Sequence, residues 1–318
     1  MSDDNEKNVA ETIERSMLER LVLAYLNEQR RARRWGVFFK LFGIVWLFLV
    51  FFVLLGHFDG EFVSTTPHTA LVDLKGEIGG DAGVTADALV SALNTAFDDK
   101  HTKAVVLRIN SPGGSPVQAG QVFDEIKRLR TAYPKIPLYV VVDDICASGG
   151  YYIAAAADKI FVDKASLVGS IGVLMDGFGF TESMKKLGIE RRMLAAGDNK
   201  GFLDPFSPIQ PEQQMHAKMM LEEIHQQFIQ VVRQGRGKRL KETPDMYSGL
   251  LWSGARSIEL GLADALGSLD YVAREVVKVE DIVDFTPQEG LADRLARRIG
   301  TAAGDAMRPW AGAATRLH

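Results

Sequence analysis

The chain has 318 residues and a formal net charge of −4, with 47% hydrophobic and 25% charged residues. These proportions are typical of a globular protein of one or two domains, and the charge balance gives no reason to expect a nucleic acid partner. The single cysteine, Cys146, excludes a disulfide framework or a cysteine-based zinc site within the chain.

The N-terminal region predicts a membrane anchor. Residues 35–57 contain the run LFGIVWLFLVFFVLLG and are interrupted only by Lys40, so they reach the length of about 20 residues that spans a bilayer. The run RRARR precedes them, and no Lys or Arg follows until Lys75. The positive-inside rule then places residues 1–34 in the cytoplasm and the bulk of the chain on the other side. A cleaved signal peptide is the alternative, but its apolar region would be shorter and a small-x-small cleavage site would follow.

Beyond a linker at residues 58–68, strands and helices are predicted to alternate through a domain at residues 69–280. Strands are predicted at 69–78, 103–109, 137–145, 159–163, 169–175 and 191–196, and helices at 86–99, 117–133, after Ser148, and at 181–188, 211–234 and 254–263. This alternation favours a largely parallel α/β sheet, and near-continuous apolar strands such as YVVV fit burial on both faces. Residues 281–318 are predicted to form a C-terminal tail, for which a helix is the favoured structure.

Two glycine-containing turns follow predicted buried strands. The first is RINSPGGSP at residues 108–116, and the second is DICASGG, which contains Ser148. Glycine permits close backbone approaches, and Ser148 would lie at a helix N-terminus, where unpaired N–H groups favour negative charge. An acyl-transfer serine needs such an oxyanion hole beside an exposed hydroxyl. The alternative is that Ser148 is only an N-cap residue.

A nucleophilic serine also needs a base, and none of the six histidines is well placed. His101 is expected at the opposite end of the sheet, and His216 and His225 lie on the long predicted helix. A lysine can act as the base where burial disfavours its ammonium form, and Lys200 in the loop GDNKGFLDPFSP is the best candidate. The alternative is a solvated loop lysine. Cys146 is on a strand without a cationic neighbour, which favours a buried structural thiol over a nucleophile.

Cofactor motifs are missing from the sequence. There is no phosphate-binding loop, GFGF at residue 177 lacks the third glycine of a dinucleotide fingerprint, and no cluster has metal-ligand spacing. We therefore expect neither a cofactor nor a metal.

Four segments together resemble the signal peptide peptidase A family, the bacterial membrane-anchored Ser-Lys proteases. They are INSPGGSPVQAG, ASGGYYIAAAADKI, LVGSIGV and GDNKGFLDPFSP, and they occur in the order found in that family. The resemblance covers about residues 69–280. Members of that family also usually carry a short N-terminal anchor, as this sequence is predicted to do. The resemblance implies a crotonase-like or Clp-protease-like α/β fold with a single N-terminal transmembrane helix.

The resemblance also implies the site residues. Ser148 would be the nucleophile and Lys200 the general base, with Ser170 in VGSIGV orienting the lysine. The oxyanion hole would use backbone N–H groups of the two glycine turns, Gly149 together with Gly113 or, as the alternative, Gly114. A lysine base must be neutral, so activity is expected to rise toward alkaline pH.

The family's substrates are remnant signal peptides left in the membrane, and its members assemble into rings. The resemblance therefore implies short apolar peptides as substrates, a homo-oligomer, and a bilayer partner for residues 35–57. It places the chain in the bacterial cytoplasmic membrane with its catalytic domain on the extracytoplasmic side. Two alternatives on the same fold are an enzyme acting on acyl-CoA thioesters, which the topology disfavours, and a non-catalytic membrane-tethered scaffold, which the presence of Ser148 and Lys200 disfavours.

Overall fold

The computed structural model describes residues 28–31, 33–52, 65–80 and 83–287. The chain divides into two compact units, residues 63–287 and residues 1–62 together with 288–318. Most of the predicted cytoplasmic segment at residues 1–34, most of the linker and the predicted tail from residue 288 lie outside the described residues.

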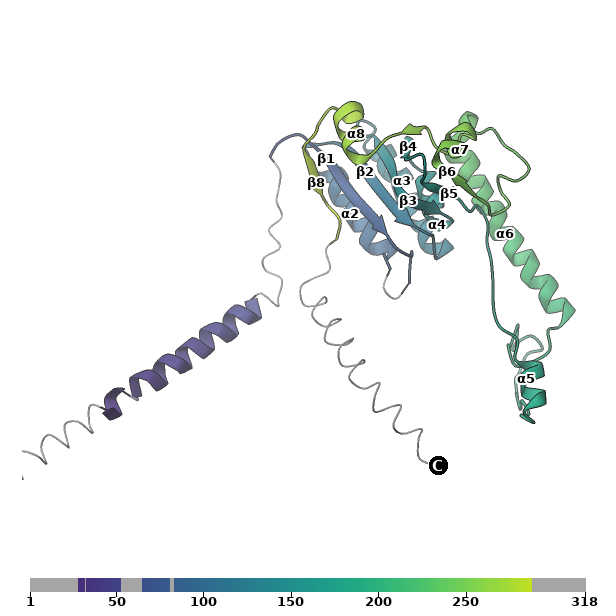
Figure 1. Ribbon diagram of the computed structural model, residues 1–318, viewed down its shortest axis with the longest axis horizontal. Helices are drawn as coiled ribbons and strands as arrows, with labels where there is room; N and C mark the ends of the chain where they lie inside the picture. The colour runs from purple at the N-terminus through teal and green to yellow at the C-terminus, as the bar shows by residue number, and fades with distance from the viewer. Residues whose placement is uncertain (1–27, 32, 53–64, 81–82, 288–318) are drawn as a thin grey trace, which may run out of the picture. The chain divides into compact units, whose positions relative to one another are not determined.

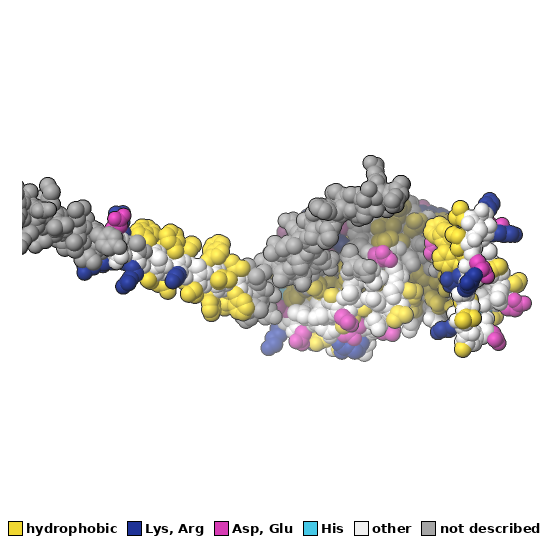
Figure 2. All heavy atoms as spheres, turned by 90° about the horizontal axis from the view of Figure 1, so that it is seen from below, with side chains coloured by type: hydrophobic (Ala, Val, Ile, Leu, Met, Phe, Trp, Pro, Cys, Tyr) yellow, Lys and Arg dark blue, Asp and Glu magenta, His cyan; other side chains and the backbone are white. Residues whose placement is uncertain are grey.

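A single helix, Glu28–Phe52, is the one helix among the described residues that is long and apolar enough to cross a membrane. Its 25 residues correspond to about 38 Å of helix, more than the bilayer core of about 30 Å. Figure 2 shows hydrophobic side chains along it and Lys and Arg side chains toward its N-terminal end. By length and composition, this helix agrees with the predicted anchor.

The second unit is built on an eight-stranded sheet (Figure 1). Its strands are β1 (His68–Lys75), β2 (Thr102–Ser111), β3 (Leu138–Ala147), β4 (Lys159–Val162), β5 (Leu167–Gly169), β6 (Leu251–Ser253), β7 (Ala265–Leu266) and β8 (Ile282–Asp284). The order is β6-β5-β3-β2-β1-β8, and β4 branches from β3 to pair with β7. All pairs are parallel except β5–β6, so β1, β2, β3 and β5 end at the same edge.

Three helices pack together over one face of the sheet: α2 (Ala86–Asp98), α3 (Pro116–Ala132) and α4 (Gly149–Ala154). The side chain of Thr85 accepts a hydrogen bond from the Ala88 N–H at the start of α2, and Pro116 occupies the first turn of α3. Their apolar faces form the main core with the buried positions of the strands. A smaller cluster on the other face includes Val272, at the start of a π-helix, Val272–Val277.

A 26-residue helix, α6 (Pro211–Arg236), connects this layer to a projecting segment. We call residues 173–210 the arm; it contains α5 (Thr181–Lys186), which Figure 1 shows at the far end of α6 from the sheet. The C-terminal half of α6 packs on the core, where the rings of Phe228 and Tyr152 lie 5.1 Å apart. The remaining short elements are α7 (Gly254–Glu259), α8 (Leu269–Tyr271) and a 3-10 turn, Gly237–Arg239.

Two of the predicted strands are wrong. β5 ends at Gly169 instead of continuing to residue 175, and residues 191–196 form no strand. Both segments enter the arm, where the described residues offer no neighbouring strand to complete a hydrogen-bonded ladder. At the other end of the chain, β8 pairs with β1, so the beginning of the predicted tail segment belongs to the sheet.

Candidate active site

Ser148 lies at the junction of β3 and α4 in a conformation that serine rarely adopts. Its φ is 49° and its ψ is −123°, and its side chain makes no capping hydrogen bond. Non-glycine residues persist at such angles only when the surrounding structure holds them, and they cluster at functional sites. The Ser148 N–H donates to the Gly169 carbonyl over 2.9 Å, and this bond fixes the turn. The Ser148 side chain therefore does not cap the N-terminus of α4.

The glycines around Ser148 pack so closely on their neighbours that larger side chains would have to displace them. A Cβ atom at position 113 would lie 2.7 Å from the Ser148 Cβ and 2.9 Å from the Gly149 nitrogen. A Cβ atom at position 150 would lie 3.3 Å from the Ser111 carbonyl oxygen. The first glycine turn thus packs directly on the second, which joins segments that are about 35 residues apart in sequence.

The hydrogen bonds of the first turn distinguish its two glycines. The Gly113 N–H donates to the Ser111 Oγ over 3.2 Å. Ile78 makes a parallel bridge to Gly114, in which its N–H donates to the Gly113 carbonyl over 2.8 Å and its carbonyl accepts from the Ser115 N–H over 2.9 Å. In a parallel bridge of this kind, both bonds go to the neighbours of the bridged residue. The N–H of Gly114 therefore points away from Ile78.

Gly149 lies next to the Gly114 nitrogen. A Cβ atom at position 149 would be 3.4 Å from the Gly114 nitrogen. Gly149 is the first residue of α4, where an N–H has no partner within its own helix. Among the described residues, neither of these two N–H groups has an acceptor. Two unpaired backbone donors thus lie beside Ser148, and they come from Gly114 and Gly149.

Ser170 lies at the end of the neighbouring strand. Ala147 of β3 is in register with Gly169 of β5, so Ser148 and Ser170 follow paired strand ends. Ser170 also has a positive φ, 49°, and its N–H donates to the Leu250 carbonyl over 2.8 Å. The sheet therefore brings together Ser148, Ser170 and the glycines of both turns.

Within one chain, Lys200 does not lie near Ser148 and Ser170. It is exposed on the arm, and the neighbouring Asn199 accepts a hydrogen bond from the side chain of Gln213, near the start of α6. Further along α6, the Nε2 atom of His225 lies 3.1 Å from the carbonyl oxygen of Ile171, the residue that follows Ser170. The 12 residues from Gln213 to His225 cover about 18 Å along the helix. The four-carbon side chain of a lysine is much shorter than that separation.

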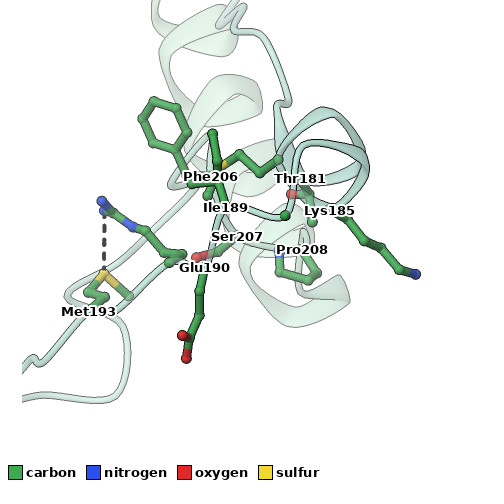
Figure 3. A pocket seen from close by; sticks show the side chains of 11 residues that line it. Thr181, Lys185, Ile189, Glu190, Met193, Phe206, Ser207 and Pro208 are labelled. Atoms are coloured by element: carbon green, nitrogen blue, oxygen red, sulfur yellow. Dashed lines mark hydrogen bonds between the residues drawn. The ribbon is translucent and has the colours of Figure 1, made fainter.

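A hollow of about 660 Å³ lies on the arm and contains none of the predicted site residues (Figure 3). Its lining combines apolar and charged side chains, among them Ile189, Phe206, Lys185 and Glu190. Because it belongs to the arm, it is not the space beside Ser148.

The thiol of Cys146 is fully buried at the end of β3, and burial raises its pKa far above the ordinary value. A thiol that stays protonated is a poor nucleophile. The predicted burial of Cys146 is confirmed.

The family model of peptidase family S49 matches residues 131–282, which include Ser148, Ser170 and Lys200. A putative protease of Synechocystis sp. is 30% identical over 205 residues, covering 64% of this chain and 72% of the relative. The chain belongs to peptidase family S49. A putative signal peptide peptidase of Enterococcus faecium is 29% identical over 197 residues, covering 62% of this chain and 57% of that protein. The resemblance to the signal peptide peptidase A family and the expected Clp-like α/β fold are confirmed.

Another similar protein, from Brucella abortus, is named Na(+)/H(+) antiporter NhaA. It is 44% identical over 216 residues, which are 67% of this chain but only 29% of that protein. More than two thirds of the Brucella protein therefore lies outside the match. The relatives from Synechocystis sp. and Enterococcus faecium carry protease and signal peptide peptidase names, which agree with the S49 family model.

Sequence reasoning missed two residues of the site. Ile78 was expected at the end of a strand, and Ser111 only as part of the first glycine turn. The glycines on either side of Ile78, in the run KGEIGG, were the available signal, since they break a strand at a point of close backbone approach.

Proposed function

We propose that the protein is a serine endopeptidase with Ser148 as its nucleophile. The observation that carries this proposal is the strained, uncapped Ser148 beside two unpaired backbone N–H groups, in a chain that belongs to peptidase family S49. A tetrahedral intermediate needs such preorganised donors for its oxyanion. We assign them to Gly114 and Gly149, and we prefer Gly114 over Gly113 because the Gly113 N–H already donates to Ser111.

The reaction is acyl transfer in two steps. The Ser148 Oγ attacks a peptide carbonyl carbon while its proton passes to the neutral amine of Lys200, and the two glycine N–H groups hold the oxyanion. The C–N bond then breaks, and the lysine returns the proton to the leaving amine. Water hydrolyses the acyl-enzyme and regenerates the Ser148 hydroxyl. Ser170, at the neighbouring strand end, would orient the lysine.

Because Lys200 is distant from Ser148 in its own chain, we propose that it acts on Ser148 of a second copy. The surface of the arm supports this assembly, since several of its large apolar side chains are exposed to solvent (Figure 2). Phe178 is 80% exposed, Leu174 is 78% exposed and Leu194 is fully exposed. Several large apolar side chains left exposed on one projecting segment favour its use as a protein interface. A head-to-tail contact between the arm of one copy and the sheet edge of the next would close into a ring.

The proposed substrates are remnant signal peptides and other short apolar peptides, at the bacterial cytoplasmic membrane. The name of the Enterococcus relative and the apolar helix Glu28–Phe52 support this proposal. The arginines near the N-terminal end of that helix, at residues 30–34, favour a cytoplasmic N-terminus and an extracytoplasmic catalytic domain. A reporter fused after residue 318 tests the orientation, and a cytoplasmic signal would refute it.

Co-expression of two inactive variants of the full chain tests the nucleophile, the base and their origin. We expect Ser148→Ala and Lys200→Ala each to lose hydrolysis of a fluorogenic apolar peptide. If the dyad forms between copies, random mixing of the two in a ring restores about one quarter of the sites. Lys185→Ala, another exposed lysine on the arm, is the matched control and is expected to stay active.

The outcomes separate the alternatives. A co-expressed mixture that stays inactive, while Lys185→Ala is active, would refute assembly of the site from two copies. Activity that survives in Ser148→Ala would refute the nucleophile. An inactive wild-type protein that forms rings would instead support the membrane-tethered scaffold.

A further inference from the structure

The loop after β1 forms a small ladder against the first glycine turn. Ile78 bridges Gly114 on one side and Val84 on the other. On the Val84 side, the Gly79 N–H donates to the Val84 carbonyl over 2.9 Å, and the Val84 N–H donates to the Glu77 carbonyl over 3.0 Å. The ladder therefore ties the glycine turn to the residues that precede α2.

Ile78 contacts both of the residues that supply the unpaired N–H groups. Its backbone lies so close to Gly114 that a Cβ atom there would be 2.2 Å from the Ile78 carbonyl oxygen. Its side chain is 2% exposed, and its Cδ1 lies 3.4 Å from the position that a Cβ atom of Gly149 would occupy. One residue thus meets the turn through its backbone and the start of α4 through its terminal methyl group.

The ladder is itself held by α3. The Oε1 of Gln118 accepts a hydrogen bond from the Ala86 N–H over 2.8 Å. The Nε2 of the same side chain would lie 2.5 Å from a Cβ atom at Gly79. Gln118 therefore holds the ladder where α2 begins and against the glycine that follows Ile78.

We propose that Ile78 is a positioning residue that sets the spacing and direction of the Gly114 and Gly149 N–H groups. This inference rests on the proposed function. Ile78 touches no reacting atom and acts only through the two donors. Preorganised donors stabilise the oxyanion because they need no reorganisation when charge develops, so a small displacement of either one lowers the rate of the chemical step. Binding of the peptide, which does not depend on that charge, is expected to stay unchanged.

The test is Ile78→Val in the full chain, because this substitution removes only the Cδ1 methyl and keeps both backbone hydrogen bonds. We expect kcat to fall about tenfold, less than the loss of a whole donor, with KM within about twofold of wild type. Ile126→Val removes the same methyl group from a fully buried position of α3, and we expect it to leave kcat unchanged. Ile78→Leu, which restores a δ carbon, is expected to recover part of the lost rate.

A second variant keeps the proposal testable if Ile78→Val does not fold. Gln118→Met removes the hydrogen bond to Ala86 and leaves Ile78 in place, and we expect kcat to fall with KM unchanged. Equal kcat values for Ile78→Val and Ile126→Val, or a folded Gln118→Met with wild-type kcat, would overturn the positioning role. Ser148→Ala is measured beside these variants. If the proposed function itself is wrong, Ser148→Ala stays active; if only the role of Ile78 is wrong, Ser148→Ala is inactive.

Discussion

Replacement of Gly113 by alanine tests the contact between the two glycine turns. The new Cβ would lie 2.7 Å from the Ser148 Cβ and 3.0 Å from the Ala147 carbonyl oxygen, and neither is the flexible end of a side chain. Gly113 also has a φ of 110°, which an L-residue adopts only with strain. The turn and the nucleophile must therefore move apart.

The expected loss of stability and of activity in Gly113→Ala follows from the displacement of the glycine turn and of Ser148. Backbone strain at one such position costs about 1–3 kcal/mol, and each kcal/mol lowers the melting temperature of a unit of this size by about 2–4 °C. The effect on kcat is expected to be larger, because the clash forces apart the glycine turn and the nucleophile, and the loss of one oxyanion donor lowers kcat by about 100-fold to 1000-fold. The expected variant is thus folded at 25 °C but nearly inactive.

The assay compares thermal unfolding and peptide hydrolysis of the full chain for Gly113→Ala and Gly120→Ala. Gly120 is inside α3, and a Cβ atom there would meet only the Tyr152 hydroxyl, at 4.0 Å. Alanine in a helix interior is preferred over glycine by about 1 kcal/mol, so this control should be active and slightly more stable. Wild-type kcat in Gly113→Ala would refute the close packing of the first turn on Ser148. Loss of activity in Gly120→Ala would show that the assay reports on general damage.

Two further predictions concern buried polar groups of the sheet unit. Burial alone would raise the pKa of Asp264, but the hydrogen bond and charge of Arg236 outweigh burial and hold that pKa below its ordinary value. The ion pair therefore stabilises the fold above the ordinary carboxyl pKa, and this contribution is lost as pH falls through the lowered one. In urea unfolding, Asp264→Asn is expected to cost about 3–5 kcal/mol at pH 7 and to show a shallower loss of stability on acidification; an equally steep acid loss would contradict the assignment. Cys146, whose burial raises its pKa, is expected to resist a thiol reagent in the native protein and to react in urea, and rapid native labelling would contradict its burial.

Much of the fold was predictable from local patterns. The helices at α2, α3 and α6 follow from apolar periodicity, and Pro211 marks the start of α6, all within a few residues in sequence. The run of small residues around Ser148 predicted a turn between strand and helix for the same local reason. The strands expected at 169–175 and 191–196 failed because a strand also needs a neighbour, and the arm supplies none.

The sequence by itself determined the apolar N-terminal segment, the alternation of strands and helices, and the presence of a serine and a lysine in family S49 motifs. The tertiary structure decided which glycine N–H is unpaired, since the Ser111 bond and the Ile78 bridge join segments distant in the chain. It also decided that Lys200 lies at the far end of α6 from Ser170. The reason is geometric: sequence spacing limits how far apart two residues can lie, whereas strand register and the length of a rigid helix set where they do lie.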